Sequence, residues 1–524
     1  MPLVKTYMNT KNIITSLLIF LVSILISLPG STISGPIWSD GQRYTFNGIL
    51  IHDMIRDGAI FHPYLYNLDF YSHFPATNLP YGPPFFALVF AFMFSLTGVS
   101  FFSARLVVAI YAGLAGLAIF FGAKHIFRNF WFSVLAAAAF LLNPLTLRLA
   151  RDITPEIPVA FWAIATMFLF INYVENDKKY MGILAALSLS LGYLTKQYIL
   201  PLGIACLVYV LLRRHWKIFF KLETYLAVLL ASVLILPPTW LAFEFANNEL
   251  GPRSTPPLGF HNMIYYVKMS LEQLPIITFF AGFGAVIGLI KKSKWAIFCS
   301  IWIACIYAFY TFYMRHQEIK YFFNFVPPLI ILFTMGMHEI AQKFKRKHAE
   351  KVVASAACAW FVILGINAPV YSVQGYQEAG EFVAEHMKGK SVLFYGQRDG
   401  SFMMGIRKKF PVNPPHVLRG DRTLAVRVSY GDAKQYVNVS NHQDIKNLLQ
   451  QYHADYVVIE ENPSYQRNYQ EYRILLETVQ NNQCFEKVAT FPIKKNTYLH
   501  LPSESLNVYK YNLDEDKELP DQIE

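Results

Sequence analysis

The chain has 524 residues, of which 54% are hydrophobic and only 15% are charged. Because ordinary soluble proteins carry about 25% charged residues, this composition excludes that class and indicates a membrane protein. The formal net charge of +11 does not indicate a nucleic-acid partner, since the lysines and arginines gather in short clusters between apolar runs, as in the positively charged cytoplasmic loops of membrane proteins.

Apolar runs of membrane-spanning length predict a polytopic α-helical protein with about 11 transmembrane helices. In chain order the runs occupy residues 13–30, 103–123, 131–147, 158–174, 180–195, 198–212, 224–245, 274–290, 295–313, 321–340 and 352–371. The first run follows two lysines and lacks a small-residue cleavage site, so we expect an uncleaved first span.

A further apolar run, residues 84–99, decides which side of the membrane the later loops face. If this run crosses the membrane, every later loop changes sides. If it lies in the interface, the basic clusters between spans all face the cytoplasm, where positive loops are preferred. These clusters are Lys124/Arg128, Lys178/Lys179, Arg213/Arg214/Lys217/Lys221, Lys291/Lys292/Lys294 and Lys343/Lys345/Arg346/Lys347. We therefore predict an interfacial helix at 84–99, a cytoplasmic N-terminus and an extracytoplasmic C-terminal region.

The first extracytoplasmic loop, residues 31–102, is a candidate for chemistry. A long polar loop in a compact protein is usually functional or disordered, and the many aromatic residues of this one argue against disorder. Transfer of a group onto a hydroxyl needs a base for the proton and positive charge for a leaving phosphate. Asp40 is the candidate base and Arg43 a candidate phosphate ligand. The alternative is that Asp40 caps a helix that begins near Gln42.

A second acid, Glu156, lies between two spans on the same predicted side as Asp40. It is expected to orient an acceptor or, together with Asp40, to hold a divalent cation such as Mg²⁺ or Mn²⁺. Two acids do not fix a metal site, so the metal ligands stay unknown. Asp152 is the competing choice for the second acid.

Three cations lie at the predicted outer ends of spans, where positive residues are disfavoured: Lys196, Arg315 and Lys320. Binding of a lipid phosphate would explain all three. Snorkelling explains Lys196 equally well, and pairing with Glu318 would explain the other two. Arg105 is expected to be a snorkelling anchor at the interface.

From about residue 372 the composition is that of a soluble domain. Helical spacing of apolar residues predicts a helix over Gln377–Met387, and short apolar runs predict buried strands at Ser391–Tyr395 and Tyr456–Glu460. A capping box within Ser440–Gln443 predicts the start of another helix. The alternation indicates a small α/β domain over 372–524 that follows a transmembrane domain over 1–371.

The order of these residues resembles the GT-C class of membrane glycosyltransferases, and within it family 39, which includes protein O-mannosyltransferases and aminoarabinose transferases of lipid A. Asp40-Gly-Gln-Arg43-Tyr44 is similar to the family's Asp-Glu-x-Arg-Tyr motif, and Tyr81-Gly-Pro-Pro84 to its Lys-Pro-Pro motif. The later landmarks are Asn143-Pro144 leading to Glu156, then Leu194-Thr195-Lys196 and Lys320-Tyr321. Each motif is weak alone, but their order and spacing make the combination specific.

The resemblance implies an inverting glycosyltransferase that moves a sugar from a polyprenyl-phosphate donor to a hydroxyl of a lipid, glycan or protein. The reaction would take place at the outer face of a bacterial inner or plasma membrane. Asp40 would be the catalytic base and Glu156 the second catalytic acid. The expected donor-phosphate ligands are Arg43, Lys196, Arg315 and Lys320, and the residues expected to bind substrate are Tyr44, Tyr81, His62 and Tyr321.

Three positions depart from the family's pattern. Gly41 stands in place of Glu, Gly82 stands where a lysine often contacts phosphate, and Glu156 stands in place of Asp. These departures keep open a non-catalytic relative that serves as a binding subunit. A transporter or flippase is the other alternative, but transporters tend to have repeated halves and midplane charges. Here the ionisable residues gather at the outer ends of spans.

Overall fold

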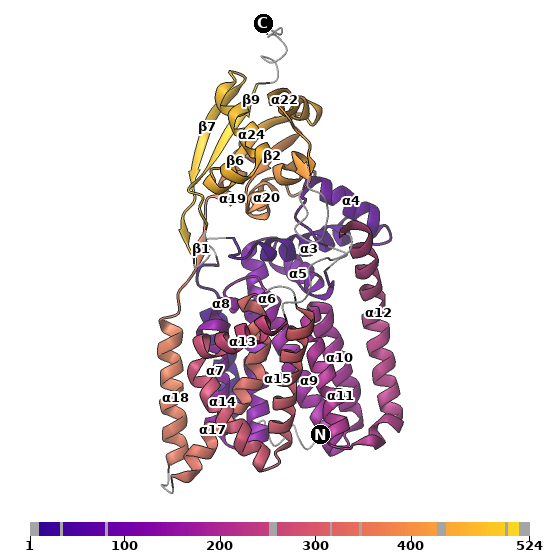
Figure 1. Ribbon diagram of the computed structural model, residues 1–524, viewed down its shortest axis with the longest axis vertical. Coiled ribbons are helices and arrows are strands. Elements are labelled where there is room, and N and C mark those ends of the chain that lie inside the picture. The colour runs from indigo at the N-terminus through magenta and orange to yellow at the C-terminus, as the bar shows by residue number, and fades with distance from the viewer. Residues whose placement is uncertain are drawn as a thin grey trace.

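The computed structural model describes residues 10–31, 35–78, 82–250, 259–314, 317–344, 348–388, 390–426, 436–497 and 501–512. A bundle of long helices forms one part, and an α/β domain lies beyond one end of it (Figure 1). The predicted division at 371/372 falls between the last helix of the bundle, which ends at Ile366, and the first strand of the domain, which begins at Ser372.

Each predicted span overlaps one helix of the bundle or two consecutive ones. The helices are α2 (Thr10–Ser27), α6 (Phe101–Phe127), α7 (Phe130–Leu141), α8 (Pro144–Ala150), α9 (Glu156–Asn176), α10 (Lys179–Thr195), α11 (Leu200–Leu212), α12 (Leu222–Leu250), α13 (Phe260–Gln273), α14 (Pro275–Ile290), α15 (Lys294–Tyr313), α16 (Ile319–Phe322), α17 (Val326–Lys343) and α18 (Ala349–Ile366). Short 3₁₀ turns lie at η1 (Gln197–Ile199), η2 (Trp216–Phe220) and η3 (Phe323–Phe325).

Not every helix is long enough to span a membrane alone. Among the described residues, seven are long and apolar enough to do so, and up to nine if α7–α8 and α13–α14 each form one bent span. These pairs bend by 59° and 110°. The two remaining predicted spans are the shorter helices α10 and α11. The predicted polytopic helical architecture is therefore confirmed.

The first loop folds into three helices, α3 (Ser39–Arg56), α4 (Pro63–His73) and α5 (Phe85–Thr97). Figure 1 places α3 and α5 across the end of the bundle nearest the α/β domain. The helix predicted at 84–99 is α5, and it has only 13 residues. It ends where Gly98 adopts a φ of +83°, a conformation that glycine tolerates best.

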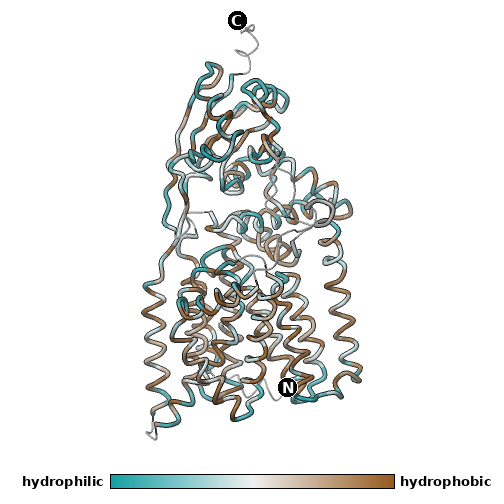
Figure 2. The backbone as a smooth tube through the Cα atoms, in the orientation of Figure 1, coloured by the Kyte–Doolittle hydropathy of each residue, from teal (hydrophilic) through white to brown (hydrophobic). Residues whose placement is uncertain are grey.

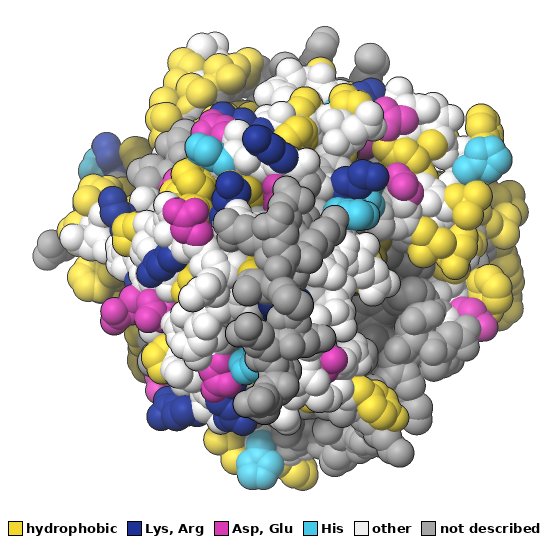
Figure 3. Space-filling view, turned by 90° about the horizontal axis from the view of Figure 1, so that it is seen from above, with side chains coloured by type: hydrophobic (Ala, Val, Ile, Leu, Met, Phe, Trp, Pro, Cys, Tyr) yellow, Lys and Arg dark blue, Asp and Glu magenta, His cyan; other side chains and the backbone are white. Residues whose placement is uncertain are grey.

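Hydropathy divides the molecule into layers. The bundle is brown, and therefore apolar, along its length, with polar turns at the end farthest from the α/β domain (Figure 2). Basic loop residues at that end pair with acids of neighbouring helices: Lys291 Nζ lies 2.5 Å from Glu339 Oε2, and Arg213 Nη2 lies 3.5 Å from Glu175 Oε1. Seen from above the α/β domain, acidic and basic side chains are interspersed over the described surface (Figure 3).

The C-terminal domain is built on a five-stranded sheet with the order β3-β2-β6-β9-β7. Its strands are β2 (Ser391–Tyr395), β3 (His416–Arg419), β6 (Ala454–Glu460), β7 (Phe485–Pro492) and β9 (Ser505–Tyr511), and its helices are α19 (Tyr376–His386), α20 (Asp399–Lys409), α21 (Gly420–Thr423), α22 (His442–Gln451), α23 (Pro463–Asn468) and α24 (Gln470–Asn481). Two small strand pairs join β1 (Ser372–Val373) to β8 (Lys495–Asn496) and β4 (Ala425–Val426) to β5 (Tyr436–Val437). Strands β3, β2 and β6 run parallel to one another. Strand β9 is antiparallel to both of its neighbours, β6 and β7.

The sheet has an apolar core on each face, and successive side chains of a strand point to opposite cores. In β2, Val392 and Phe394 belong to the core that also contains α19 and α20 residues and the membrane bundle, whereas Leu393 and Tyr395 belong to the core that contains α22 and α24 residues. The predicted strands and the helix near 377–387 are confirmed. The predicted capping box is displaced by one residue, because the cap of α22 is Asn441, whose side chain accepts from the N–H of Asp444.

Helices α14 and α17 pack backbone against backbone at two glycines, Gly284 and Gly336. A Cβ atom on Gly284 would lie 2.0 Å from the carbonyl oxygen of Leu332 and 2.7 Å from the amide nitrogen of Gly336. Small residues at such crossings allow backbones to pack directly in membrane proteins. Gly282, two residues away on the same helix, has open space around it.

We predict that Gly284→Val destabilises the protein by about 1–3 kcal/mol, because the added side chain must push the two backbones apart. Gly282→Val is the matched control and should leave stability close to that of the wild type. The measurement is the apparent melting temperature in detergent, followed by size-exclusion chromatography of heated samples. Equal melting temperatures for the two variants would contradict the close packing.

Candidate active site

The turn before α3, residues 35–38, determines where Asp40 lies. Its backbone N–H groups at Ile37 and Trp38 donate to the carboxylate of Asp152 over 3.0–3.1 Å, and Asp152 is 1% exposed. On the other side, Arg105 donates to the carbonyl oxygens of Ser31 and Gly35 at 3.0 and 2.7 Å. These bonds satisfy buried peptide groups that belong to no helix or sheet.

Two predictions are corrected by these contacts. Arg105 is not a snorkelling anchor, because it is 1% exposed and binds backbone carbonyls. Asp152, the competing second acid, is committed to holding the turn before α3. Gly41 also has a structural reason, since a Cβ atom there would lie 2.7 Å from Pro36 and 2.9 Å from the carbonyl oxygen of Ile153.

Asp40 lies in the first turn of α3, and its side chain faces Lys320 of α16. The N-cap position is occupied by Trp38, without a side-chain cap, so Asp40 does not cap the helix. Its Oδ2 atom accepts a hydrogen bond of 2.6 Å from Lys320 Nζ. The Asp40 side chain remains 45% exposed, whereas that of Lys320 is 8% exposed. The carboxylate is therefore both paired and accessible.

The electrostatic surroundings favour the ionised form of Asp40. Burial by itself raises the pKa of this carboxyl, but the charge and the hydrogen bond of Lys320 lower it. The charges of Lys196 and Arg43 act in the same direction, and the pKa lies below the ordinary aspartate value. Asp40 is consequently a carboxylate at neutral pH and can accept a proton.

Glu156 forms a second carboxylate–lysine pair. It begins α9, and its Oε1 atom accepts a hydrogen bond of 2.5 Å from Lys196 Nζ at the end of α10. The Glu156 side chain is 4% exposed and that of Lys196 is 14% exposed. Snorkelling does not describe Lys196, because its ammonium group is held by a buried acid.

The two lysines lie against one aromatic ring. Lys196 Nζ is 5.6 Å and Lys320 Nζ is 5.7 Å from the centre of the Tyr321 ring. Tyr198 packs edge-on against Tyr321 with ring centres 4.7 Å apart. Lys320 also pairs with Glu318 at 2.6 Å, as the alternative explanation of this cation anticipated. Asp40, Glu156, both lysines and Tyr321 thus form one cluster.

A cavity of about 150 Å³ adjoins this cluster. Its walls come from α3, from the first turn of α5 and the segment before it, and from the junction of α10 and η1. The lining residues are Tyr44, Asn47, Asn78, Gly82, Pro83, Phe86, Ala87, Thr195, Lys196, Gln197 and Tyr198. Burial, followed by the charges of Asp40 and Glu156, raises the pKa of Tyr44, so its hydroxyl keeps its proton and can donate.

The other predicted residues fall in different places. Arg43 lies one residue before Tyr44 on α3 and acts on Asp40 through its charge. His62 is exposed at the start of α4 and does not line the cavity. Tyr81 and Arg315 lie outside the described residues.

Several lining residues were missed by the sequence reasoning. Gln197 and Tyr198 directly follow Lys196, and Asn47 lies one helical turn beyond Tyr44, so their positions could have been inferred by adjacency. Asn78 gave no sequence cue. Its N–H donates to the Asn47 side-chain oxygen at 2.9 Å, and its side chain fills the space beside Gly82, where a Cβ would lie 3.1 Å from Asn78 Oδ1.

The cluster does not have the composition of a metal site. Among the residues that the structure describes, no three His, Cys, Asp or Glu side chains converge as a metal site requires. The two carboxylates considered for a cation, Asp40 and Glu156, each bind a lysine ammonium group instead. Positive charge at this site is supplied by lysines.

Known proteins share the fold and part of the sequence. A model of the dolichyl-phosphate-mannose-protein mannosyltransferase family matches residues 81–241, a segment that contains Glu156 and Lys196 but not Asp40. The undecaprenyl phosphate-alpha-4-amino-4-deoxy-L-arabinose arabinosyl transferase 1 of Proteus mirabilis (strain HI4320) is 24% identical over 300 residues. That match covers 53% of this chain and 53% of the relative, so the chain spans about half the length of the curated relative it matches.

Two solved structures of ArnT from Cupriavidus metallidurans are similar over nearly the whole chain. The structure bound to undecaprenyl phosphate has a TM-score of 0.60 and 14% identity, and the similarity covers 94% of this chain and 97% of that one. The apo structure has a TM-score of 0.59 and 14% identity, with 95% and 98% covered. The chain is an integral membrane protein that shares the fold of these two ArnT structures. The resemblance to family 39 predicted from the sequence is confirmed.

We predict that Lys320→Gln raises the pKa of Asp40, because the substitution removes the ammonium group that favours the ionised carboxyl. The measurement is a pH titration of the carboxyl band in infrared difference spectra, each variant being compared with its Asp40→Asn form. The midpoint should move to higher pH. Lys268→Gln, which removes an exposed lysine paired with Glu272 on α13, should leave the midpoint unchanged. An unmoved midpoint in Lys320→Gln would contradict the pairing.

Proposed function

We propose that this protein is an inverting glycosyltransferase that moves a sugar from a polyprenyl-phosphate donor to a hydroxyl acceptor. The observation that carries the proposal is an accessible, ionised Asp40 beside two lysine ammonium groups at a polar cavity. A base and adjacent positive charge are the two requirements for transfer from a phosphate. The names of the similar proteins, which mention an undecaprenyl-phosphate sugar and bound undecaprenyl phosphate, support the donor class.

The proposed reaction is a single displacement. Asp40 accepts the proton of the acceptor hydroxyl while the hydroxyl oxygen forms a bond to the anomeric carbon of the sugar. The bond from that carbon to the phosphate oxygen breaks on the opposite face, which inverts the configuration. The phosphate leaves with its negative charge, which Lys196 and Lys320 stabilise. Arg43 and Arg315 are the further proposed ligands of the donor phosphate.

The tyrosines and Glu156 have positioning parts in this proposal. Tyr44 lines the cavity with a protonated hydroxyl, which suits a hydrogen bond to a sugar oxygen. Tyr321 holds both lysines against its ring. Glu156 keeps Lys196 in place through its 2.5 Å bond. No step is routed through a divalent cation, because Asp40 and Glu156 are already paired with lysines.

We place the reaction at the extracytoplasmic face of a bacterial inner membrane, with the N-terminus in the cytoplasm. The basic loops favour this orientation, since they lie at the bundle end opposite the site. The acceptor would be a lipid, glycan or protein that reaches this face.

The base is tested with undecaprenyl-phosphate sugars and a crude envelope acceptor, in detergent, with wild type beside Asp40→Asn. General bases contribute about 10²–10⁴-fold, so kcat should fall by about that factor in Asp40→Asn. Asp69→Asn changes an exposed acid on α4 of the same loop and should retain wild-type turnover. Full activity of Asp40→Asn would overturn the proposed mechanism. Chelation of divalent cations should leave turnover unchanged.

A further inference from the structure

The C-terminal domain turns the carboxyl ends of its parallel strands toward the first loop. In α/β domains, ligands bind at the carboxyl ends of parallel strands. Here the parallel strands β2 and β3 end at Tyr395 and Arg419, close to Arg398 at the start of α20. Arg398 donates to carbonyl oxygens of the turn before α3, and Arg419 donates to the carbonyl oxygen of Pro75 at 3.0 Å. The edge that usually binds a ligand is occupied by a segment of the same chain.

Arg398 binds the turn from which the helix of the candidate base begins. Its Nη1 atom donates to the Pro36 carbonyl at 2.6 Å and its Nη2 atom to the Ile37 carbonyl at 2.7 Å, and the side chain is 4% exposed. The same turn accepts a hydrogen bond from Arg105 and donates hydrogen bonds to Asp152. The turn that sets the start of α3 is thus held by three buried charged side chains, one of which belongs to the C-terminal domain.

Neighbouring contacts of α20 hold the first turn of α3 as well. The N–H of Ser401 donates to Gln42 Oε1 at 3.2 Å. Gly400 lies so close to Gln42 that a Cβ atom would come within 2.6 Å of that side chain. Gln42 is two residues from Asp40, so the beginning of α20 is packed directly on the helical turn that carries the base.

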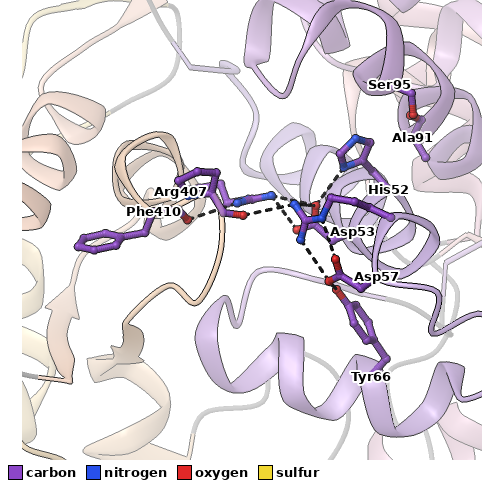
Figure 4. A network of polar contacts seen from close by, with 10 residues as sticks. His52, Asp53, Asp57, Tyr66, Ala91, Ser95, Arg407 and Phe410 are labelled. Carbon is purple, nitrogen blue, oxygen red and sulfur yellow. Dashed lines mark hydrogen bonds and ion pairs between the residues drawn. The ribbon is translucent and has the colours of Figure 1, made fainter.

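A separate ion pair holds the far end of α3. Arg407 Nη2 lies 2.8 Å from both carboxylate oxygens of Asp53, and the two side chains are 4% and 7% exposed. Figure 4 shows Arg407 and Asp53 pointing toward one another, with His52 beside them. His52 Nδ1 lies 3.0 Å from Asp53 Oδ1. Helix α3 is therefore attached to α20 near both of its ends.

We propose that Arg398 is a positioning residue for Asp40, so that the C-terminal domain is an integral part of the catalytic site. This inference rests on the proposed function. Arg398 does not touch the cavity; it acts by fixing the backbone from which α3 begins. A base must be within hydrogen-bond reach of the proton it accepts, and a displacement of about 1 Å costs on the order of 100-fold in rate.

The principal test is Arg398→Lys in the full-length protein. Lysine keeps the charge but cannot bind two carbonyl groups with one planar fork. We expect kcat to fall about 10- to 100-fold, while KM for the donor changes by less than about threefold, since the lysines at the phosphate are untouched. Arg467→Lys on α23 changes an exposed arginine and is the matched control, with wild-type kinetics expected.

A double-mutant cycle separates positioning from a general loss of structure. If Arg398 acts through Asp40, Arg398→Lys should lower the residual rate of Asp40→Asn by less than about twofold, because the group it positions is already absent. A merely structural role would reduce the rate by the same factor in both backgrounds. Equal factors, or an unchanged kcat in the single variant, overturn the proposal. Melting temperatures and elution profiles identify any variant that fails to fold.

A second readout does not depend on turnover. If Arg398→Lys lets Asp40 move away from Lys320, the infrared titration midpoint of Asp40 should move to higher pH. An unmoved midpoint in folded Arg398→Lys overturns the positioning proposal, even if no sugar donor is consumed by the wild type. Absence of wild-type turnover with every donor would instead count against the proposed function.

Discussion

The structure depends on how the irregular turn before α3 satisfies its buried peptide groups. This turn lies in no helix or sheet, so its N–H and carbonyl groups need partners from elsewhere. Asp152 accepts two of its N–H groups, whereas Arg105 and Arg398 donate to its carbonyls. The three side chains come from the bundle, a bundle loop and the C-terminal domain. Their convergence sets the direction of α3 and hence the position of Asp40.

The site pairs its acids with lysines instead of concentrating charges of one sign. Each candidate acid binds a lysine, and both lysines lie against the ring of Tyr321. Pairing is necessary because the side chains of Glu156 and Lys320 are almost fully buried, and a buried unpaired charge is costly. It also explains how the site can offer an ionised base and positive charge for an anionic leaving group within a few residues.

The C-terminal domain has a different place in the protein from the one its separate composition indicates. It has its own sheet and a core of its own on the α22/α24 face, as an independent domain would. Its other face, however, shares a continuous core with the membrane bundle, and the carboxyl edge of its parallel strands is bound to the first loop. The two parts are therefore joined by apolar packing as well as by buried arginine contacts. A change in the domain is expected to reach the site through α3.

Hydropathy and short-range spacing determined the elements of this protein. The spans, the strand at 391–395 and the helix at 376–386 follow from apolar runs and periodicity, which depend only on neighbouring residues. The sequence also indicated Asp40 and Glu156 as site acids and Lys196 and Lys320 as site cations, the lysines because positive charge at the outer end of a span is disfavoured. It named His62 as well, which lies at the start of α4 and does not line the cavity.

Only the tertiary structure decided the partners of the site residues. Asp40 and Lys320 are 280 positions apart, and Arg398 reaches Pro36 across 362. Such pairings are set by how helices and domains pack, which local pattern does not encode. For the same reason the structure, and not the sequence, assigned Arg105 and Asp152 to the turn before α3.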